Sequence, residues 1–175
     1  MRQSNYARVE DGKIYGLGAD GIKYRMMKEA IKGYYDNHLV PASNMPSIQE
    51  INYSMGIFPD MGTQHSAKRM WQGLVEFLDD VQHNNRIECN SYFAIFDEIV
   101  IESEEHFQWL LWTQLEYAPK NIIQLPQGED AKYVSSESDF CIIVGGNPIT
   151  VLCLHPQHSN QARRFPWPVL IFRLT

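Results

Sequence analysis

The sequence predicts an α+β fold in a single domain spanning residues 1–175, with a mainly antiparallel sheet of about four strands packed with about three helices. Three observations carry this prediction. The chain is 44% hydrophobic and 12% aromatic, which is enough to build one sizeable core. Three amphipathic helical patterns lie between residues 22 and 115. Strand patterns joined by short connections dominate residues 139–175, and short connections make consecutive strands antiparallel neighbours.

The charge and composition exclude several classes of partner. The net charge is −6 and the 15 basic residues are spread along the chain, so we expect binding neither to nucleic acid nor to a membrane. We expect a cytoplasmic protein, because no apolar run approaches the roughly 20 residues of a membrane span and the start has no apolar core typical of a signal peptide.

Cys141 and Cys153 lie inside apolar strand patterns, so we expect both thiols to be buried and no structural disulfide.

The first helix is expected to follow Asp20 and to end near Asn37. Its apolar residues recur at near-helical spacing and are Ile22, Met26, Met27, Ala30, Ile31 and Tyr34. The glycine-rich residues 9–21 before it are interpreted as a turn. A dinucleotide-binding loop would need a preceding hydrophobic strand and a third glycine at the right step, and the sequence has neither.

A long connection and a second helix come next. Residues 40–60 contain three prolines and no sustained period, so we expect a loop that ends at Phe58-Pro59-Asp60. The second helix is expected from Thr63 or Ser66 to about Val81, because its apolar residues form one broad face. His65 lies in the first turn of this helix.

A strand and a third helix are expected in the middle of the chain. The residues from Ser91 to Phe96 favour a strand. Ser103 to His106 predicts the start of a helix, because the two glutamates there are favourable near a helix N-terminus. The inner face of this helix is predicted to consist of Phe107, Leu110, Leu111, Gln114 and Leu115. The polar residues 127–139 have no apolar period and predict a surface loop.

The last part of the chain contains three strongly β-forming runs. Phe140–Val144 and Ile149–Leu154 are joined by Gly-Gly-Asn-Pro, which predicts two strands connected by a tight turn. A third run begins at Val169. Between the second and third runs lies a polar loop, residues 155–168, that carries most of the candidate chemistry.

Two histidines and two arginines stand out in this loop. His155 follows a strand directly and precedes a proline, so a stiff backbone fixes its ring direction, as suits a metal or haem ligand. A hydrogen-bonded histidine at a strand end is the alternative. His158 could join His155 on one metal, although the sequence has no HExxH motif and no acidic cluster to complete a zinc site. Arg163 and Arg164 suit a carboxylate, a phosphate or a haem propionate, or they pair with surface carboxylates.

These residues resemble a known family. The succession of strand, glycine turn, strand, HPxxSxxARRF and strand over residues 140–172 is similar to the YqcI/YcgG-like proteins. Phe58-Pro59 resembles the Phe-Pro-Cys element of that family, with Asp60 in place of the cysteine, and residues 104–115 resemble its acidic-aromatic helix. The resemblance starts at Phe58, and we expect residues 1–57 to form an N-terminal helix and loop region of the same domain. We expect the chain to lack the family's usual C-terminal portion.

The resemblance implies a haem-dependent oxygenase, because the family includes haem-dependent N-hydroxylases of the guanitoxin and cycloserine pathways. The implied reaction hydroxylates a guanidine or amine nitrogen of arginine or a related amino acid, and it needs an electron donor. The resemblance implies His155 as the axial haem ligand, with His65 as the next candidate. It implies anion binding for Arg163 and Arg164, and a hydrogen bond near the ligand for Ser159.

Two other functions stay open. One is a non-catalytic binding or interaction protein that keeps the fold, in which a shortened end exposes an apolar groove that a homodimer would cover. The other is a metal-dependent enzyme that uses His155 and His158 without a porphyrin.

Overall fold

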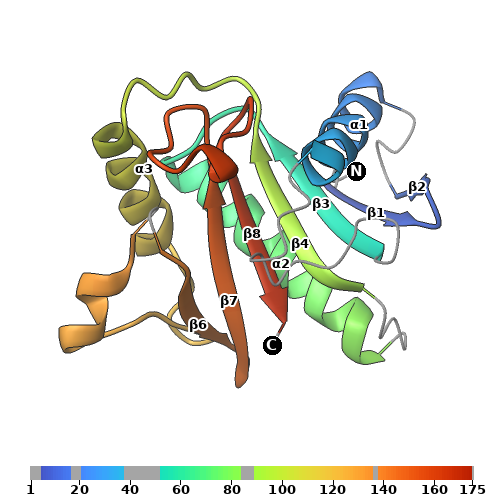
Figure 1. Cartoon of the computed structure of the whole chain (residues 1–175). Coiled ribbons are helices and arrows are strands. Elements are labelled where there is room, and N and C mark those ends of the chain that lie inside the picture. Colours follow the sequence, from blue (N-terminus) through green and yellow to red (C-terminus); the bar gives the residue numbers. More distant parts are fainter. Residues whose placement is uncertain (1–4, 17–20, 38–51, 84–88, 136–137, 175) are drawn as a thin grey trace.

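The computed structural model describes residues 5–16, 21–37, 52–83, 89–135 and 138–174. Eight strands within these residues form one sheet in the order β2-β1-β3-β4-β8-β7-β6-β5 (Figure 1). The strands are β1 (Tyr6–Glu10), β2 (Lys13–Tyr15), β3 (Asn52–Phe58), β4 (Cys89–Phe96), β5 (Ile123–Gln124), β6 (Phe140–Val144), β7 (Asn147–Leu154) and β8 (Val169–Leu174).

The prediction of about four antiparallel strands is wrong. The sheet has eight strands and is mixed, because β3 and β4 are parallel. β3 falls inside the segment that was expected to be a loop. All its residues after Asn52 are buried, since both faces of this strand are covered, and a strand covered on both faces lacks the alternation of polar and apolar residues that reveals a strand in a sequence.

The N-terminal hairpin was also missed. β1 and β2 pair antiparallel around Asp11-Gly12, and both turn residues have positive φ angles, 52° and 78°. This conformation is typical of a two-residue hairpin turn, for which Asp-Gly is a favoured sequence. The strand signal was too short to be recognised, because β2 has only three residues.

The three predicted helices are confirmed as α1 (Ile22–Asn37), α2 (Gln64–His83) and α3 (Glu104–Glu116). The expected start of α3 is correct: Ser103 is its N-cap, and its Oγ accepts a hydrogen bond of 3.0 Å from the backbone N–H of His106. The proposed start of the first helix at Asp20 lies outside the described residues. Residues 127–139, expected to be a loop, include a 3₁₀ helix from Gly128 to Tyr133.

The helices cover both faces of the sheet (Figure 1). α1 packs through Met27, Ile31 and Tyr35 on one face. α2 and α3 pack on the other face, where Trp71, Phe77 and Phe107 are among the buried side chains. β3, α2 and β4 thus form a parallel βαβ unit in an otherwise antiparallel sheet.

The two cysteines of the last strands differ in exposure. Cys153 is buried as predicted, whereas the prediction for Cys141 is wrong because its side chain is exposed. β6 alternates between buried and exposed residues, so only one of its faces is covered by the core.

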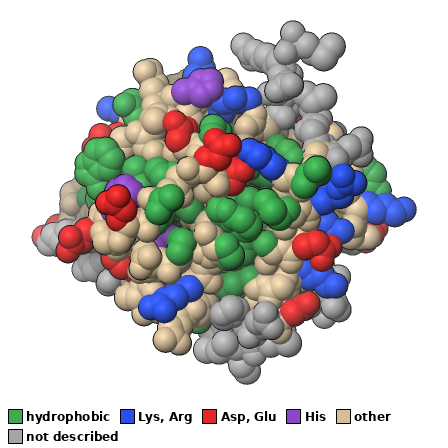
Figure 2. All heavy atoms as spheres, turned by 90° about the horizontal axis from the view of Figure 1, so that it is seen from above, with side chains coloured by type: hydrophobic (Ala, Val, Ile, Leu, Met, Phe, Trp, Pro, Cys, Tyr) green, Lys and Arg blue, Asp and Glu red, His purple; other side chains and the backbone are tan. Residues whose placement is uncertain are grey.

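One end of the sheet gathers the segments that carry the candidate residues. β3, β4 and β7 end there, and β8 begins there, because β8 is antiparallel to both β4 and β7. We call residues 59–63, 97–103 and 155–168, which connect elements at this end, the upper rim. Figure 2 looks down on this end and shows hydrophobic side chains gathered near its centre. Among the described helices, none is both long and apolar enough to cross a bilayer.

Candidate functional site

The loop of residues 155–168 is held in one conformation by contacts to itself and to α1. Within it, the backbone N–H of His155 donates to the carbonyl of Arg163, and that of Phe165 donates to the carbonyl of His155. From α1, the hydroxyl of Tyr34 donates to the carbonyl of Ala162 at 2.5 Å, and the Tyr34 ring meets the Phe165 ring edge to face. The polar side chains of the loop therefore start from a fixed backbone.

Glu104, the first residue of α3, reaches across to both histidines of this loop. Its Oε2 lies 2.9 Å from Nε2 of His155, and its Oε1 lies 3.7 Å from Nδ1 of His158. Oε1 also accepts a hydrogen bond of 2.7 Å from the backbone N–H of Ser159. One ligand-type atom from each of Glu104, His155 and His158 lies within 4.8 Å of the others. We call these three residues the Glu-His-His cluster.

The hydrogen bonds of His155 define its tautomer. Its Nδ1 accepts from the backbone N–H of Gln157 at 3.2 Å, so the proton of the neutral ring is on Nε2 and is donated to Glu104. Burial lowers the pKa of His155 to about 4, and the nearby charge of Glu104 opposes this shift only in part. The ring is therefore neutral near pH 7.

Aromatic contacts fix the orientation of the His155 ring. The ring of Phe107, one turn into α3, stacks on it with a centroid distance of 4.2 Å and an interplanar angle of 18°. His158 lies on another side, with its ring centroid 5.0 Å away. The side chains of His155 and His158 are 0% and 1% exposed, whereas that of Glu104 is 25% exposed. The cluster thus meets solvent through the side chain of Glu104.

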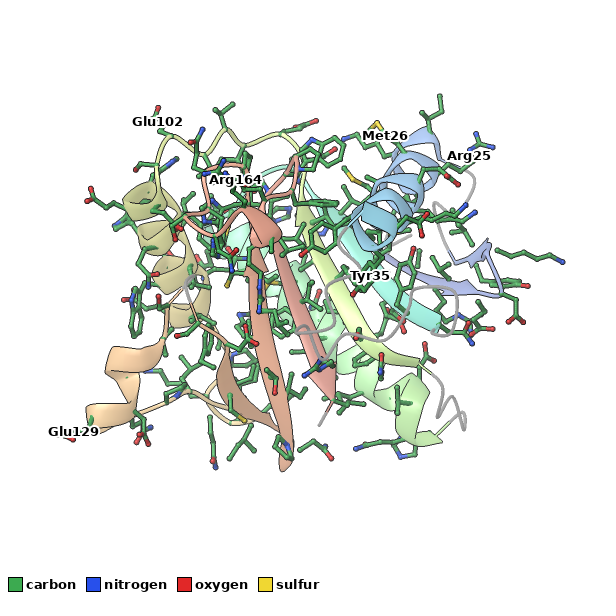
Figure 3. The ribbon with its side chains drawn as sticks, in the orientation of Figure 1. Arg25, Met26, Tyr35, Glu102, Glu129 and Arg164 are labelled. Carbon is green, nitrogen blue, oxygen red and sulfur yellow. The ribbon has the colours of Figure 1, made fainter. Side chains whose placement is uncertain are left out.

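The other predicted residues of this loop have different surroundings. Arg163 pairs with Asp139 at 3.1 Å. Arg164 is exposed, and its Nε donates to the carbonyl of His158 at 2.8 Å. Figure 3 shows Arg164 on the β7–β8 loop at the same end of the molecule as Glu102, just before α3. Ser159 meets the cluster through its backbone N–H.

His65 lies apart from the Glu-His-His cluster. It is exposed in the first turn of α2, directly after residues 59–63 of the upper rim. Its side chain makes no hydrogen bond or ion pair with any part of the chain that the structure describes. Its imidazole is consequently available to a ligand, in contrast to that of His155.

Two open hollows lie elsewhere, around β5. One of 710 Å³ is lined mainly by residues 124–127 and 139–141. The other, of 580 Å³, is lined by Leu115, Glu116, Ala118, Lys120, Ile123, Gln124, Leu125 and Gln127. Neither is lined by His65, His155, Ser159, Arg163 or Arg164.

Sequence reasoning missed Glu104 as part of the site. The sequence seemed to offer no acidic partner for His155 and His158, because Glu104 is far from them along the chain. One sequence feature could have indicated it. Glu104 is the first residue of a helix, directly after the capping Ser103, and the cap fixes the backbone from which the Glu104 side chain extends. The sequence does not show that this helix end docks on the β7–β8 loop.

Comparison with known proteins gives one match. A family model described as the YqcI/YcgG family matches residues 43–175, which include β3, all the strands after it, α2, α3 and the whole upper rim. No curated protein and no solved structure matches the chain.

Proposed function

The chain belongs to the YqcI/YcgG family, and from this premise we propose that it is a haem-dependent oxygenase that hydroxylates a guanidine or amine nitrogen of arginine or a related amino acid. The observation that carries the proposal is the family match, which includes the whole HPxxSxxARRF loop, residues 155–165. The proposal requires an amino-acid-like substrate and an electron donor as partners.

The chemistry divides between the haem and the chain. Bound haem would supply the iron that activates dioxygen, so that one oxygen atom enters a substrate N–H bond and the other leaves as water after uptake of two electrons and two protons. The chain would hold the iron through a side chain, bind the propionates and position the substrate nitrogen.

His155 does not fit the axial position in the arrangement described above. Its Nε2 donates to Oε2 of Glu104 at 2.9 Å, so that carboxylate stands directly in front of the nitrogen. The ring is also 0% exposed, and a flat macrocycle needs open space in front of the ligating nitrogen. The proposal therefore assigns the axial position to His65, whose exposed ring supports this choice.

Exposed apolar and cationic groups at and near the upper rim are of the kinds that bind haem. Ile22 and Val100 are both 78% exposed, and they belong to the start of α1 and to the upper rim. Among the described residues, Arg164 is anchored only through its Nε, and its remaining N–H groups can bind a propionate or the carboxylate of an amino acid. Arg163 is less available because Asp139 pairs with it.

The first test is a titration with hemin followed by its visible absorption. Wild type should bind one equivalent and give a sharp Soret band that shifts on reduction, and His65→Ala should lose saturable binding. His83→Ala is the matched control, because His83 is an exposed histidine at the other end of α2. The loaded wild-type protein should then convert arginine to a product heavier by one oxygen atom, as detected by mass spectrometry.

The proposal fails if wild type shows no saturable haem binding, and a non-catalytic binding protein would then be the better description. Saturable binding that His65→Ala retains would keep the haem proposal and remove His65 from the axial position.

A further inference from the structure

We propose that Glu104, His155 and His158 bind a divalent first-row transition metal ion, at a site distinct from the axial position assigned to His65. Three convergent side chains carry this inference: one ligand-type atom from each lies within 4.8 Å of the others. They come from two segments, the start of α3 and the end of β7, that only the fold brings together. The inference does not rest on the proposed haem chemistry.

The donor set indicates the class of metal. Imidazole nitrogen together with one carboxylate suits Zn²⁺ and Fe²⁺ better than Ca²⁺ or Mg²⁺, which prefer sites made wholly of oxygen. Three protein ligands leave coordination positions for water or a substrate group, as in catalytic sites and unlike closed structural ones. These positions would lie on the side of Glu104, because its side chain is 25% exposed and both histidines are buried.

The side chains are already held close to ligating positions. Phe107 stacks on the His155 ring, and the N–H of Ser159 holds Oε1 of Glu104 at 2.7 Å. The N-cap of Ser103 fixes the backbone from which Glu104 extends. Such supporting contacts orient ligands before a metal arrives, so fewer side-chain rotations are lost on binding.

Metal binding requires a limited exchange of hydrogen bonds. A metal on Nε2 of His155 replaces the proton that this nitrogen donates to Glu104, and metal sites release protons in this way. The ring then carries its proton on Nδ1, and the 3.2 Å bond from Gln157 is lost. On His158, a metal on Nδ1 replaces the 3.0 Å bond from the N–H of Asn160. The bond between His155 and Glu104 and two backbone hydrogen bonds are thereby exchanged for three metal bonds.

The test is direct metal binding to the full chain after removal of metals with a chelator. Zn²⁺ binding is measured by calorimetry, and Co²⁺ binding by the visible absorption of the coordinated ion. His83→Gln serves as the background, because His83 and Asp79 form an exposed pair, 2.7 Å apart, that could bind metal weakly at the surface. In this background we expect one equivalent of each ion and a Co²⁺ spectrum typical of nitrogen and oxygen ligands.

Glu104→Gln is the decisive variant, because its amide oxygen can still accept from His155 while the anionic ligand is gone. It should lower the Zn²⁺ affinity at least about tenfold, whereas Glu105→Gln, an exposed neighbour in the same helical turn, should leave the affinity unchanged. His158→Asn gives a second variant in case Glu104→Gln does not fold.

Three outcomes decide the matter. Two results would overturn the proposal and leave a cluster held by hydrogen bonds alone. One is no stoichiometric binding in the His83→Gln background. The other is a metal affinity in both the Glu104 and the His158 variants that equals that of the unsubstituted site. His65→Ala separates this site from the proposed function: it should keep full Co²⁺ binding while it loses haem. Loss of Co²⁺ binding in His65→Ala would contradict the assignment of two separate sites.

Discussion

At the scale of single residues, Glu104 connects α3 to the β7–β8 loop. Its carboxylate accepts from the buried Nε2–H of His155 and from the N–H of Ser159. A buried donor that loses its acceptor pays the desolvation cost of that group, about 1–3 kcal/mol. The free-energy cost of removing Glu104 therefore comes mainly from the N–H of His155 that is left without an acceptor, and less from the lost attraction between the two side chains.

We predict that Glu104→Ala lowers the free energy of unfolding by about 1–3 kcal/mol. Urea denaturation of the metal-free protein measures this. Glu105→Ala is the matched control: Glu105 is exposed in the same turn and shares the favourable effect of the helix N-terminus, so its replacement should cost less than about 1 kcal/mol. Equal small effects of the two variants would show that the contact with His155 contributes little.

At the scale of elements, α2 packs closely on the sheet because it has a glycine at the contact. A Cβ atom on Gly73 would lie 2.9 Å from Cζ of Tyr92, and closer still to its hydroxyl. On the other side, a Cβ on Gly56 of β3 would lie 2.7 Å from the same hydroxyl. Tyr92 is fully buried, and its hydroxyl has no hydrogen-bond partner within the described residues. Two glycines thus make room for one tyrosine.

We predict that Gly73→Ala lowers the free energy of unfolding by about 1–3 kcal/mol, the usual cost of overpacking a core. Tyr92→Phe should be nearly neutral because it removes an unpaired buried hydroxyl. In the Tyr92→Phe background the Gly73→Ala penalty should be smaller but not absent, because the contact with the hydroxyl is gone while Cζ still lies 2.9 Å from the new Cβ. A double-mutant cycle by denaturation measures the coupling.

Gly33 in α1 supplies the control for helix propensity. A Cβ there meets no atom within 4 Å, so Gly33→Ala should stabilise the protein by up to about 1 kcal/mol. If the penalty of Gly73→Ala is undiminished without the Tyr92 hydroxyl, the contact with that hydroxyl does not contribute to it.

At the scale of the whole molecule, the sheet has a protected centre and weak edges. β4 and β8 have a strand on each side and helices over the sheet faces, whereas β2 pairs only with β1, and β5 has two residues. Opening an edge strand exposes little apolar surface, while opening the centre unfolds the core.

We predict that amide hydrogen exchange is slowest in β4 and β8 and at least about tenfold faster in β2 and β5, because their opening free energies differ by more than about 1.4 kcal/mol. Exchange followed by mass spectrometry measures this, with each rate divided by its value for an unstructured peptide. Equal protection of β2 and β4 would mean that the N-terminal hairpin opens only with the whole sheet.

The local sequence determined the three helices and the last three strands, because spacing, the Ser103 cap and the Gly145-Gly146 turn are encoded by neighbouring residues. It also identified the loop of residues 155–168 as the place of His155 and His158. It did not determine β3, since a strand covered on both faces has no alternation to detect.

Only the tertiary structure decided which residues meet in the site. His155 and Glu104 are separated by 51 positions along the chain, and His65 comes from a different helix. Local sequence patterns indicate whether a segment favours a helix or a strand and which of its residues are buried. The contact of Glu104 with His155 depends instead on the docking of α3 beside β7, which the packing of the whole core fixes.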